Sequence, residues 1–540
     1  MASTHSPTGS ARDQRRASSP STSQDSPLDP LDLDALSLAR AMRAGTVDPV
    51  EHTERVLTRA AERGGVVGAF ASLASEYSRR QAERAGATLR HGASEGALSP
   101  LTGVPFPIKD LVEVASLPFE AGSPALAGNV GARTDGVAED LISAGTVTIG
   151  KTTTSEFGMS VFSESPAGPP ARTPWDVERT AGGSSGGAGA AVASGIVPIA
   201  HGNDAGGSIR VPAACNGVVG MVAGRGRISA GPFGADGAGL ARHGVLARTV
   251  ADVAAGMDLL THQRPGDTYL APGASRASGS QVSGASLLGA VEEALVGVRR
   301  GDVRPLRIGI ITTPMVAEVE LHPEALAAVE RARAVFAHLG HTVLQAPVPL
   351  GPEQWQSFAP VFSVGAASIP LPFGPAGSAE AISGEKAAGI GALTRWLRTR
   401  GAQVSGVEYA AAISAIQQLT RRMAEAWEGI DVIVTPTLSG PPVIAADIPE
   451  DPEENFAYQS RFTPFTSVWN MNGWAAMSVP LHRAMIAAHS TGAEGDTPPS
   501  PPRELPFGVH LAGTGPNAEA TLLSLAAQLE ALDPWPTIRW

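Results

Sequence analysis

Cysteine, lysine and long apolar runs are scarce in this chain of 540 residues. Its one cysteine, Cys215, excludes a disulfide framework and a metal site built from cysteines. No segment of about 18 consecutive apolar residues occurs, so we expect no membrane-spanning helix. Acidic residues outnumber basic ones by 52 to 40, and the net charge of −12 argues against a nucleic-acid partner. The 12 histidines show no metal-ligand spacing, and we predict neither a metal nor a cofactor.

Lysine is used only three times among the 40 basic residues, as Lys109, Lys151 and Lys386. Arginine stays protonated in proteins, whereas lysine can lose its proton when it is buried. In a chain whose usual cation is arginine, a retained lysine therefore indicates a need for an amine that can become neutral.

Two glycine-rich segments each carry a serine with a candidate catalytic role. Ser184 lies within residues 181–195, and Ser208 lies within residues 202–212. Lys109 stands 75 positions before Ser184, and Ser184 stands 24 positions before Ser208. Because glycine has no side chain, such turns can bring successive backbone N–H groups to one point.

A serine hydroxyl is a weak nucleophile near neutral pH, so a base must take its proton during attack on a carbonyl. No histidine lies in either serine turn, and we assign His201 to the end of a strand rather than to catalysis. A lysine can serve as the base once its pKa falls by roughly 2–3 units from its reference value. The apolar residues 104–108 directly before Lys109 would bury the amine and lower its pKa in this way.

These segments resemble the amidase signature family of serine hydrolases, in their spacing as well as in their residues. The resemblance extends from about Leu31 to the C-terminus. It implies an enzyme that hydrolyses a carbon–nitrogen amide bond through an acyl-enzyme. By this resemblance Ser208 is the nucleophile and Ser184 bridges it to Lys109. The resemblance also implies that the peptide bond between Gly183 and Ser184 is cis.

The residues around the nucleophile receive supporting roles. The resemblance implies an oxyanion hole made of the backbone N–H groups of Ala205, Gly206, Gly207 and Ser208. The charged neighbours Asp204 and Arg210 could orient the loops, but we favour a structural ion pair because buried charges are usually paired. Ser185 is expected to support its turn by hydrogen bonding rather than to react.

The family resemblance implies an α/β fold, in which one large domain, residues 31–540, has a central mixed β-sheet covered by helices on both faces. The mixture of helix-like and strand-like segments fits this arrangement. Residues 1–27 are rich in Ser, Thr, Pro, Arg and Asp, and we predict a disordered tail. Segments 272–301 and 490–502 have biased compositions and are predicted insertions, the second a mobile loop between two strands.

The sequence also bears on where the enzyme is located and on what it binds. No apolar segment follows Arg15 and Arg16, so we discount an export signal and expect a cytoplasmic enzyme. We expect a small-molecule amide as substrate, with no nucleic-acid partner and no membrane partner. A homodimer is one option for its assembly.

Within the family, two short stretches resemble amidases of the 6-aminohexanoate-cyclic-dimer hydrolase type. They are residues 201–205, His-Gly-Asn-Asp-Ala, and 264–268, Arg-Pro-Gly-Asp-Thr. Residues Met221–Arg225 depart from the Leu-Lys-Pro-Thr that is usual there in the family, which puts the shape of the substrate pocket in question. Aromatic side chains could line an apolar acyl pocket, although core packing is the expectation for most of them. The candidates are Trp355, Phe358, Phe362, Phe373, Trp469 and Trp474.

Residues 145–152 match the phosphate-binding pattern GxxxxGK[ST]. Residues 146–149 are all β-branched and suit a strand, and a helix-like segment precedes the motif where a phosphate loop requires a strand. We therefore expect a short strand over residues 147–149 and no nucleotide site.

Two other functions would keep the same fold. A glutamine amidotransferase subunit for tRNA charging would need partner subunits and a basic surface, and the acidic balance counts against it. A non-catalytic binding protein is suggested by the altered segment Met221–Arg225, but Lys109, Ser184 and Ser208 are all present. We therefore expect a stand-alone amidase that acts on a small or oligomeric amide, linear or cyclic.

Overall fold

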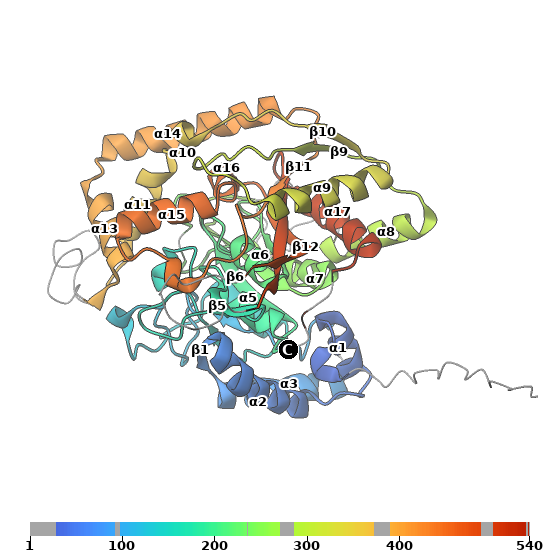
Figure 1. Cartoon of the computed structure of the whole chain (residues 1–540). Helices are drawn as coiled ribbons and strands as arrows, with labels where there is room; N and C mark the ends of the chain where they lie inside the picture. Colours follow the sequence, from blue (N-terminus) through green and yellow to red (C-terminus); the bar gives the residue numbers. More distant parts are fainter. Residues whose placement is uncertain are drawn as a thin grey trace, which may run out of the picture.

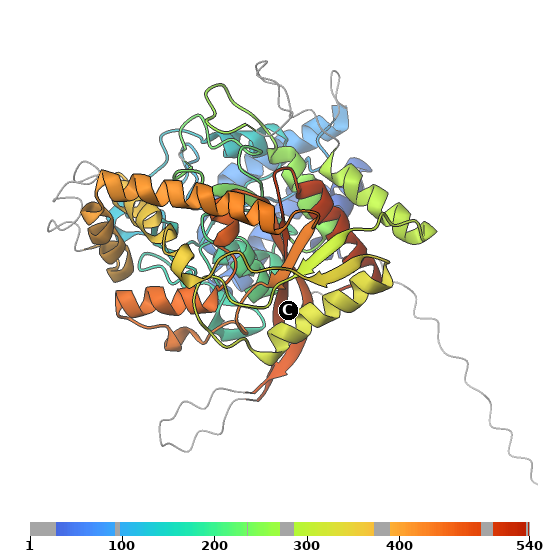
Figure 2. The ribbon, with the colours of Figure 1, turned by 90° about the horizontal axis from the view of Figure 1, so that it is seen from above.

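The computed structural model describes residues 29–91, 98–234, 236–270, 286–371, 389–487, 501–535 and 538. An eight-stranded sheet runs through the middle of the molecule (Figure 1, Figure 2). In spatial order its strands are β10 (Thr342–Gln345), β9 (Arg307–Ile310), β11 (Val432–Pro436), β13 (Arg503–Gly513), β12 (Ala476–Ile486), β7 (Val219–Val222), β8 (Arg242–Ala247) and β6 (Ile199–Asp204). The pairs β10–β9 and β9–β11 are parallel and the others are antiparallel, which confirms the predicted mixed sheet.

Alternate residues of these strands face opposite sides of the sheet. In β11, Val432 and Val434 belong to one apolar core, whereas Ile433 between them belongs to the other. Met221 and Val222 of β7 divide in the same way. The sheet therefore requires a helical layer on each face, and both layers are present.

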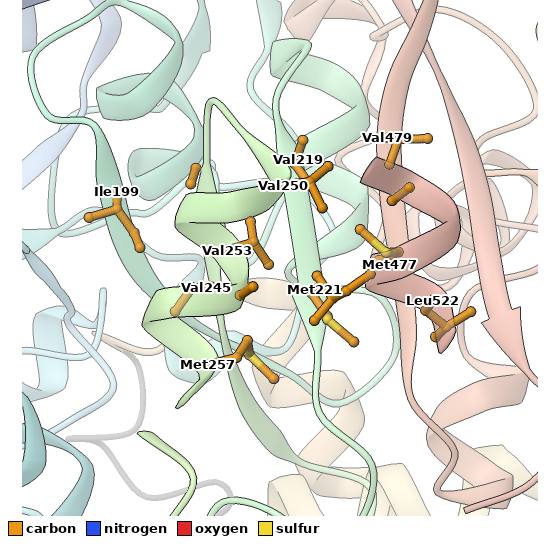
Figure 3. Packing of buried hydrophobic residues seen from close by; sticks show 14 of the residues in the cluster. Ile199, Val219, Met221, Val245, Val250, Val253, Met257, Met477, Val479 and Leu522 are labelled. Atoms are coloured by element: carbon orange, nitrogen blue, oxygen red, sulfur yellow. The ribbon is translucent and has the colours of Figure 1, made fainter. Parts of the chain in front are cut away.

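Figure 3 shows side chains at the contact between the sheet and the first helical layer. There Met221 and Val245 of the sheet lie opposite Val253 and Met257 of a helix, and Leu522 of another helix packs beside Met477. The helices of this layer are α1 (Ala35–Arg43), α4 (Gly136–Ser143), α7 (Val250–Leu260), α8 (Leu287–Arg300), α9 (Pro323–His338) and α17 (Glu519–Leu532).

The second layer contains the helices that carry the candidate site. Its members are α2 (Pro49–Val67), α5 (Gly186–Ala193), α6 (Arg210–Asn216), α14 (Gly406–Ala426) and α16 (Val468–Asn472). Helix α5 contains only glycine, alanine and valine, and all of it is buried. A Cβ at Gly187 would lie 2.4 Å from main-chain atoms of Ala69 and Thr153, so only glycine permits this close packing.

Smaller elements complete the surroundings of the second layer. They are α3 (Ser75–His91), α10 (Pro352–Trp355), α11 (Phe358–Ser368), α13 (Ala392–Gln403), α15 (Pro452–Phe462), the two-stranded ribbon of β4 (Arg172–Thr173) and β5 (Asp176–Thr180), and a small sheet of β1 (Phe70–Leu73), β3 (Gly150–Thr152) and β2 (Ile108–Lys109). The strand expected over residues 147–149 is wrong, because β3 begins at Gly150. Only a single bridge forms there, between Pro105 and Val147. The Thr148 N–H instead donates to the Gln81 side chain at 2.7 Å, and the Ile149 carbonyl accepts from Ala74 N at 2.9 Å.

The predicted tail and the predicted insertions lie largely outside the described residues. Residues 1–27, 271–285 and 488–500 are not among them. The later part of the first predicted insertion forms α8, and the second predicted insertion lies between β12 and β13. Within the described parts of the chain, no helix is both long and apolar enough to cross a membrane.

Two acidic side chains, the buried Asp252 and the partly buried Glu530, lie where helices of the first layer begin. Asp252 accepts hydrogen bonds from the first two N–H groups of α1 at 2.9 and 3.0 Å, and Glu530 accepts one from Val250 N at 3.2 Å. Burial raises the pKa of Asp252 to about 6. Burial, together with the nearby Asp252 carboxylate, raises the pKa of Glu530 to about 8.

Glu530→Gln is expected to stabilise the protein at high pH but not at low pH. The pKa of Glu530 in the folded state lies above its usual value of 4.5, so the stability linked to this proton is lost as pH rises from about 4.5 to about 8. At about 1.4 kcal/mol per pKa unit, and with the shift halved to allow for solvent screening, the loss is roughly 2 kcal/mol of unfolding free energy at pH 9. Thermal unfolding at about pH 5 and pH 9 measures this, with the exposed Glu428→Gln as control. Parallel curves of Tm against pH for wild type and Glu530→Gln would contradict it.

Candidate active site

Three segments that are distant in the sequence meet beside the second helical layer. Strand β2 ends at Lys109, the turn before α5 carries Ser184, and the turn between β6 and α6 carries Ser208. Lys109 is fully buried, while Ser184 and Ser208 are 1% and 6% exposed. The two serine turns are joined directly, because Ser185 N donates to Ser208 O at 3.1 Å.

The Lys109 amine lies among neutral oxygen atoms. Its Nζ is 2.6 Å from Ser184 Oγ, 2.6 Å from Asn203 Oδ1 and 3.3 Å from Asn203 O. Among the described residues it forms no ion pair. Burial holds the pKa of Lys109 well below its usual value, and the Asp204 charge opposes this only in part. A neutral amine has a lone pair, which at this distance can accept the hydroxyl proton of Ser184.

The turn at Ser184 is fixed by backbone contacts. The Gly183–Ser184 peptide is cis, as the family resemblance implies. A Cβ at Gly183 would lie 2.9 Å from main-chain atoms of Phe162 and Ser163, so glycine is required there. Ser163 Oγ donates to Ser184 O and accepts from Gly186 N, both at 3.1 Å. Ser184 Oγ is thereby held facing Lys109.

The turn at Ser208 is organised by the Asp204 carboxylate. Asp204 accepts hydrogen bonds from Gly207 N at 2.7 Å and from Ile209 N at 3.0 Å. Arg210 donates to the same carboxylate from two nitrogens, at 3.0 and 2.9 Å. Both charged side chains are fully buried, and the Arg210 charge holds the pKa of Asp204 below its usual range. The structure thus brings Asp204 and Arg210 together as the ion pair that the sequence favours.

A second set of contacts ties this ion pair to α16. Asn470 Nδ2 donates to Asp204 Oδ1 at 2.9 Å, and Asn470 Oδ1 accepts from Arg210 at 2.6 Å. Thr466 accepts from Arg210 through its carbonyl, and its hydroxyl donates to Gly206 O, both at 2.7 Å. The Ser208 turn is therefore held from the far C-terminal part of the chain.

The four N–H groups expected in an oxyanion hole differ in whether they already donate a hydrogen bond within the protein. The Gly207 N–H already donates to Asp204. The N–H groups of Ala205, Gly206 and Ser208 have no acceptor among the described residues. These three can donate to a bound oxygen without breaking an existing hydrogen bond.

A pocket opens beside Ser208, Ala205 and Gly206. Trp355, Phe358 and Phe362 line it as the sequence suggests. Its other described lining residues are Gly158, Met159, Ser160, Val161, Val316, Phe456, Gln459, Ser460, Thr463 and Ser467.

The remaining aromatic candidates do not form this wall. Trp469 stacks on Trp427 and donates to Gly513 O, and Trp474 also packs against Trp427. These two are core residues, as expected for most of the candidates. Phe373 lies outside the described residues.

The other residues weighed from the sequence have structural contacts. His201 Nδ1 accepts from the Lys109 main-chain N–H at 3.4 Å, and its Nε2 lies 3.1 Å from His243 Nδ1. Burial lowers the pKa of both histidines. Lys151, the lysine of the phosphate-loop pattern, is buried on β3 and pairs with Asp110 at 2.9 Å. It lies in a strand rather than in a glycine-rich loop.

The sequence analysis did not identify two residues whose hydrogen bonds support the site. Asn203 is a direct partner of the Lys109 amine, and its place just before Asp204 was the available signal. Arg225 ends the altered segment and donates to the carbonyls of Asn470 and Met471, both at 3.1 Å. Nothing in the local sequence pairs Arg225 with α16, because the two are far apart in the chain.

Comparison with known proteins gives one family for nearly the whole chain. The family model described as Amidase matches residues 51–523. The chain is 32% identical over 519 residues to the 6-aminohexanoate-cyclic-dimer hydrolase of Paenarthrobacter ureafaciens, covering 93% of this chain and 95% of that protein. It is also 32% identical over 520 residues to the hydrolase of the same name from Pseudomonas sp. strain NK87, with the same coverage.

Solved structures show the same relationship. A 6-aminohexanoate cyclic dimer hydrolase complexed with substrate is similar with a TM-score of 0.76 and 29% identity, covering 94% of this chain and 98% of that one. The peptide amidase of Stenotrophomonas maltophilia shares the fold with a TM-score of 0.73 at 23% identity, covering 93% and 97%. The likeness predicted from residues 201–205 and 264–268 is therefore confirmed.

Arg210→Met is expected to destabilise the protein by about 3–5 kcal/mol, because it leaves the Asp204 charge buried without its partner. Arg55→Met is the matched control, since Arg55 contacts Asp29 at 2.7 Å in a pair whose side chains are 39% and 42% exposed. That change should cost about 1 kcal/mol or less. Urea unfolding of both variants measures the difference, and equal losses would show that burial of the pair is not what matters.

Proposed function

We propose that this chain, which belongs to the Amidase family and is therefore an amidase acting on carbon–nitrogen bonds, works through Ser208, Ser184 and Lys109 and an acyl-enzyme. The observation that carries the proposal is the 2.6 Å contact between the Lys109 amine and the Ser184 hydroxyl, in a site where burial favours the neutral amine. Few structural roles would call for a buried lysine whose direct partners are all uncharged.

In this mechanism the proton passes from Ser208 through Ser184 to Lys109. Ser208 Oγ attacks the amide carbonyl carbon while its proton passes to Ser184 Oγ, and the Ser184 proton passes to Lys109 Nζ. Collapse of the tetrahedral intermediate breaks the carbon–nitrogen bond, and the same path returns a proton to the departing amine. Water then attacks the acyl-enzyme and releases the carboxylic acid, which restores Ser208.

The negative charge on the tetrahedral oxygen needs donors that are already in place. The N–H groups of Ala205, Gly206 and Ser208 serve this purpose in our proposal, since none is engaged with a described residue. The Gly207 N–H instead holds Asp204 and so fixes the shape of the turn. Losing one such donor in other enzymes costs about 2.7–4 kcal/mol, so a rigid turn matters for the rate.

The substrate in this proposal is a small or oligomeric amide, linear or cyclic. Two relatives at 32% identity carry the name 6-aminohexanoate-cyclic-dimer hydrolase, and each aligns over 93% of this chain. A pocket lies beside Ser208, where the acyl part of such an amide would bind. The enzyme needs no partner subunit in this mechanism.

Ser208→Ala is expected to lower amide hydrolysis by the purified enzyme roughly 10³-fold or more, because it removes the nucleophile. Ser184→Ala and Lys109→Met should each cost roughly 10²-fold or more, because they break the proton path. Rates on a panel of linear and cyclic amides measure this, with Ser414→Ala on the exposed side of α14 as control. Hydrolysis by Ser208→Ala at the wild-type rate would refute the mechanism. Ammonia transfer that occurs only with added subunits would favour the amidotransferase alternative.

Asn203→Asp is expected to move the acid limb of the pH–rate profile upward. Only neutral Lys109 accepts the proton, so kcat/KM should rise with pH through the pKa of Lys109, which burial holds below its usual value. A carboxylate at position 203, 2.6 Å from Nζ in the asparagine form, would stabilise the ammonium and raise that pKa by about 1–3 units. Asn203→Ala adds no charge and should not produce this shift. An unchanged acid limb in Asn203→Asp would show that Lys109 is not the base.

A further inference from the structure

The pocket beside Ser208 contains no ionisable side chain among its described lining residues. Its wall consists of glycine, alanine, serine, threonine, valine, methionine, glutamine, phenylalanine and tryptophan. The buried Asp204, which precedes the lining residue Ala205, is paired with Arg210. A charged group on the acyl part of a substrate would therefore lose its hydration without gaining a counter-charge, which is strongly unfavourable.

Four polar side chains of this wall already make hydrogen bonds within the protein. Ser467 Oγ accepts from Trp355 Nε1 at 2.8 Å, and Thr463 Oγ1 donates to Gln459 O at 2.9 Å. Ser460 Oγ donates to a carbonyl of its own helix at 2.9 Å, and Gln459 Oε1 accepts from a backbone N–H at 2.9 Å. Little hydrogen-bonding capacity is left to solvate an ion.

Three aromatic rings of the wall form a continuous stack. The Trp355 and Phe358 rings lie 5.4 Å apart, and the Phe358 and Phe362 rings lie 5.1 Å apart, each pair at an interplanar angle of 21°. The spacing of three and four residues places them on one side of α10 and α11. The hydrogen bond from Trp355 to Ser467 fixes one end of the stack, so an aromatic wall is present before any substrate binds.

Given the proposed function, on which this inference rests, we propose that the pocket selects an uncharged acyl group with a flat ring. Such a group packs against the Trp355–Phe358–Phe362 stack while its carbonyl reaches Ser208. Acyl groups that carry a full charge are rejected. Glutamine, whose acyl part bears an ammonium and a carboxylate, belongs to the rejected class.

The test compares p-nitroanilides that share one leaving group and differ in the acyl part. Phenylacetyl, 4-carboxyphenylacetyl, 4-(aminomethyl)phenylacetyl and acetyl forms supply a neutral ring, an anion, a cation and no ring. We expect kcat/KM for the neutral ring to exceed both charged analogues by at least about 100-fold and the acetyl form by roughly tenfold. Charged analogues hydrolysed within about threefold of the neutral one would overturn the proposal.

A readout without turnover separates this inference from the mechanism. A fluorophosphonate probe labels an activated serine, and the corresponding neutral primary amide should slow that labelling while the charged amides should not. Equal protection by neutral and charged amides overturns the pocket inference and leaves the mechanism intact. Absence both of labelling and of hydrolysis overturns the proposed function, and the pocket inference with it.

Two variant pairs locate the effect in the pocket. Met159→Lys places an ammonium in the wall and should raise kcat/KM for the anionic substrate relative to the neutral one by at least about tenfold, whereas Met159→Gln should not. Phe362→Leu should reduce the preference for phenylacetyl over acetyl by roughly threefold to tenfold. Phe233→Leu, at a ring that is 47% exposed and outside the pocket wall, is the matched control. Unchanged preferences in both Met159→Lys and Phe362→Leu would overturn the assignment.

Discussion

The rest of the site is fitted to one constraint, the burial of the Lys109 amine without a counter-charge. Its direct partners are Ser184 and Asn203, which offer oxygen atoms but no formal charge. The nearest buried carboxylate, Asp204, is shared between the guanidinium of Arg210 and the backbone N–H groups of its own turn. The Asp204 charge offsets only part of the effect of burial on the pKa of Lys109. The ion pair of Asp204 with Arg210 shapes the Ser208 turn, and burial favours the neutral state of the amine.

A neighbouring lysine shows the contrast. Lys151 is also fully buried, yet it faces Asp110 at 2.9 Å and contacts the Pro118 carbonyl. Burial raises the pKa of Asp110 and lowers the pKa of Lys151, while their mutual attraction opposes both shifts. The two lysines of adjacent strands thus have different environments, one paired as a structural ion pair and one left among neutral groups. Only the second arrangement suits a proton acceptor.

The altered segment Met221–Arg225 has a structural role in this chain. Arg225 donates to two carbonyls at the end of α16, and Arg242 donates to the carbonyls of Trp469 and Trp474 at 2.7 and 2.9 Å. The short helix α16 carries Asn470, which holds Asp204. Loss of the usual family residues is therefore accompanied by two arginines that donate to carbonyls at this helix end, where cations are favoured. The changed sequence keeps the support of the Ser208 turn.

The sequence by itself determined the family and the mixed α/β fold and indicated the pairing of Asp204 with Arg210, because short glycine-rich motifs with fixed spacing carry that information locally. By resemblance it also supplied the two serines and the lysine of the proposed mechanism. It did not reveal Asn203 as the partner of the amine, because the only local signal was its place just before Asp204, and nothing in the sequence pairs Asn203 with Lys109. Nor could it show that the Gly207 N–H is already engaged, or sort the aromatic residues into pocket wall and core. Those outcomes depend on which side chains the sheet and the helices α11, α15 and α16 bring within contact distance. Contacts between residues more than 200 positions apart, such as Arg210 with Asn470, are decided only when the chain packs around its two cores.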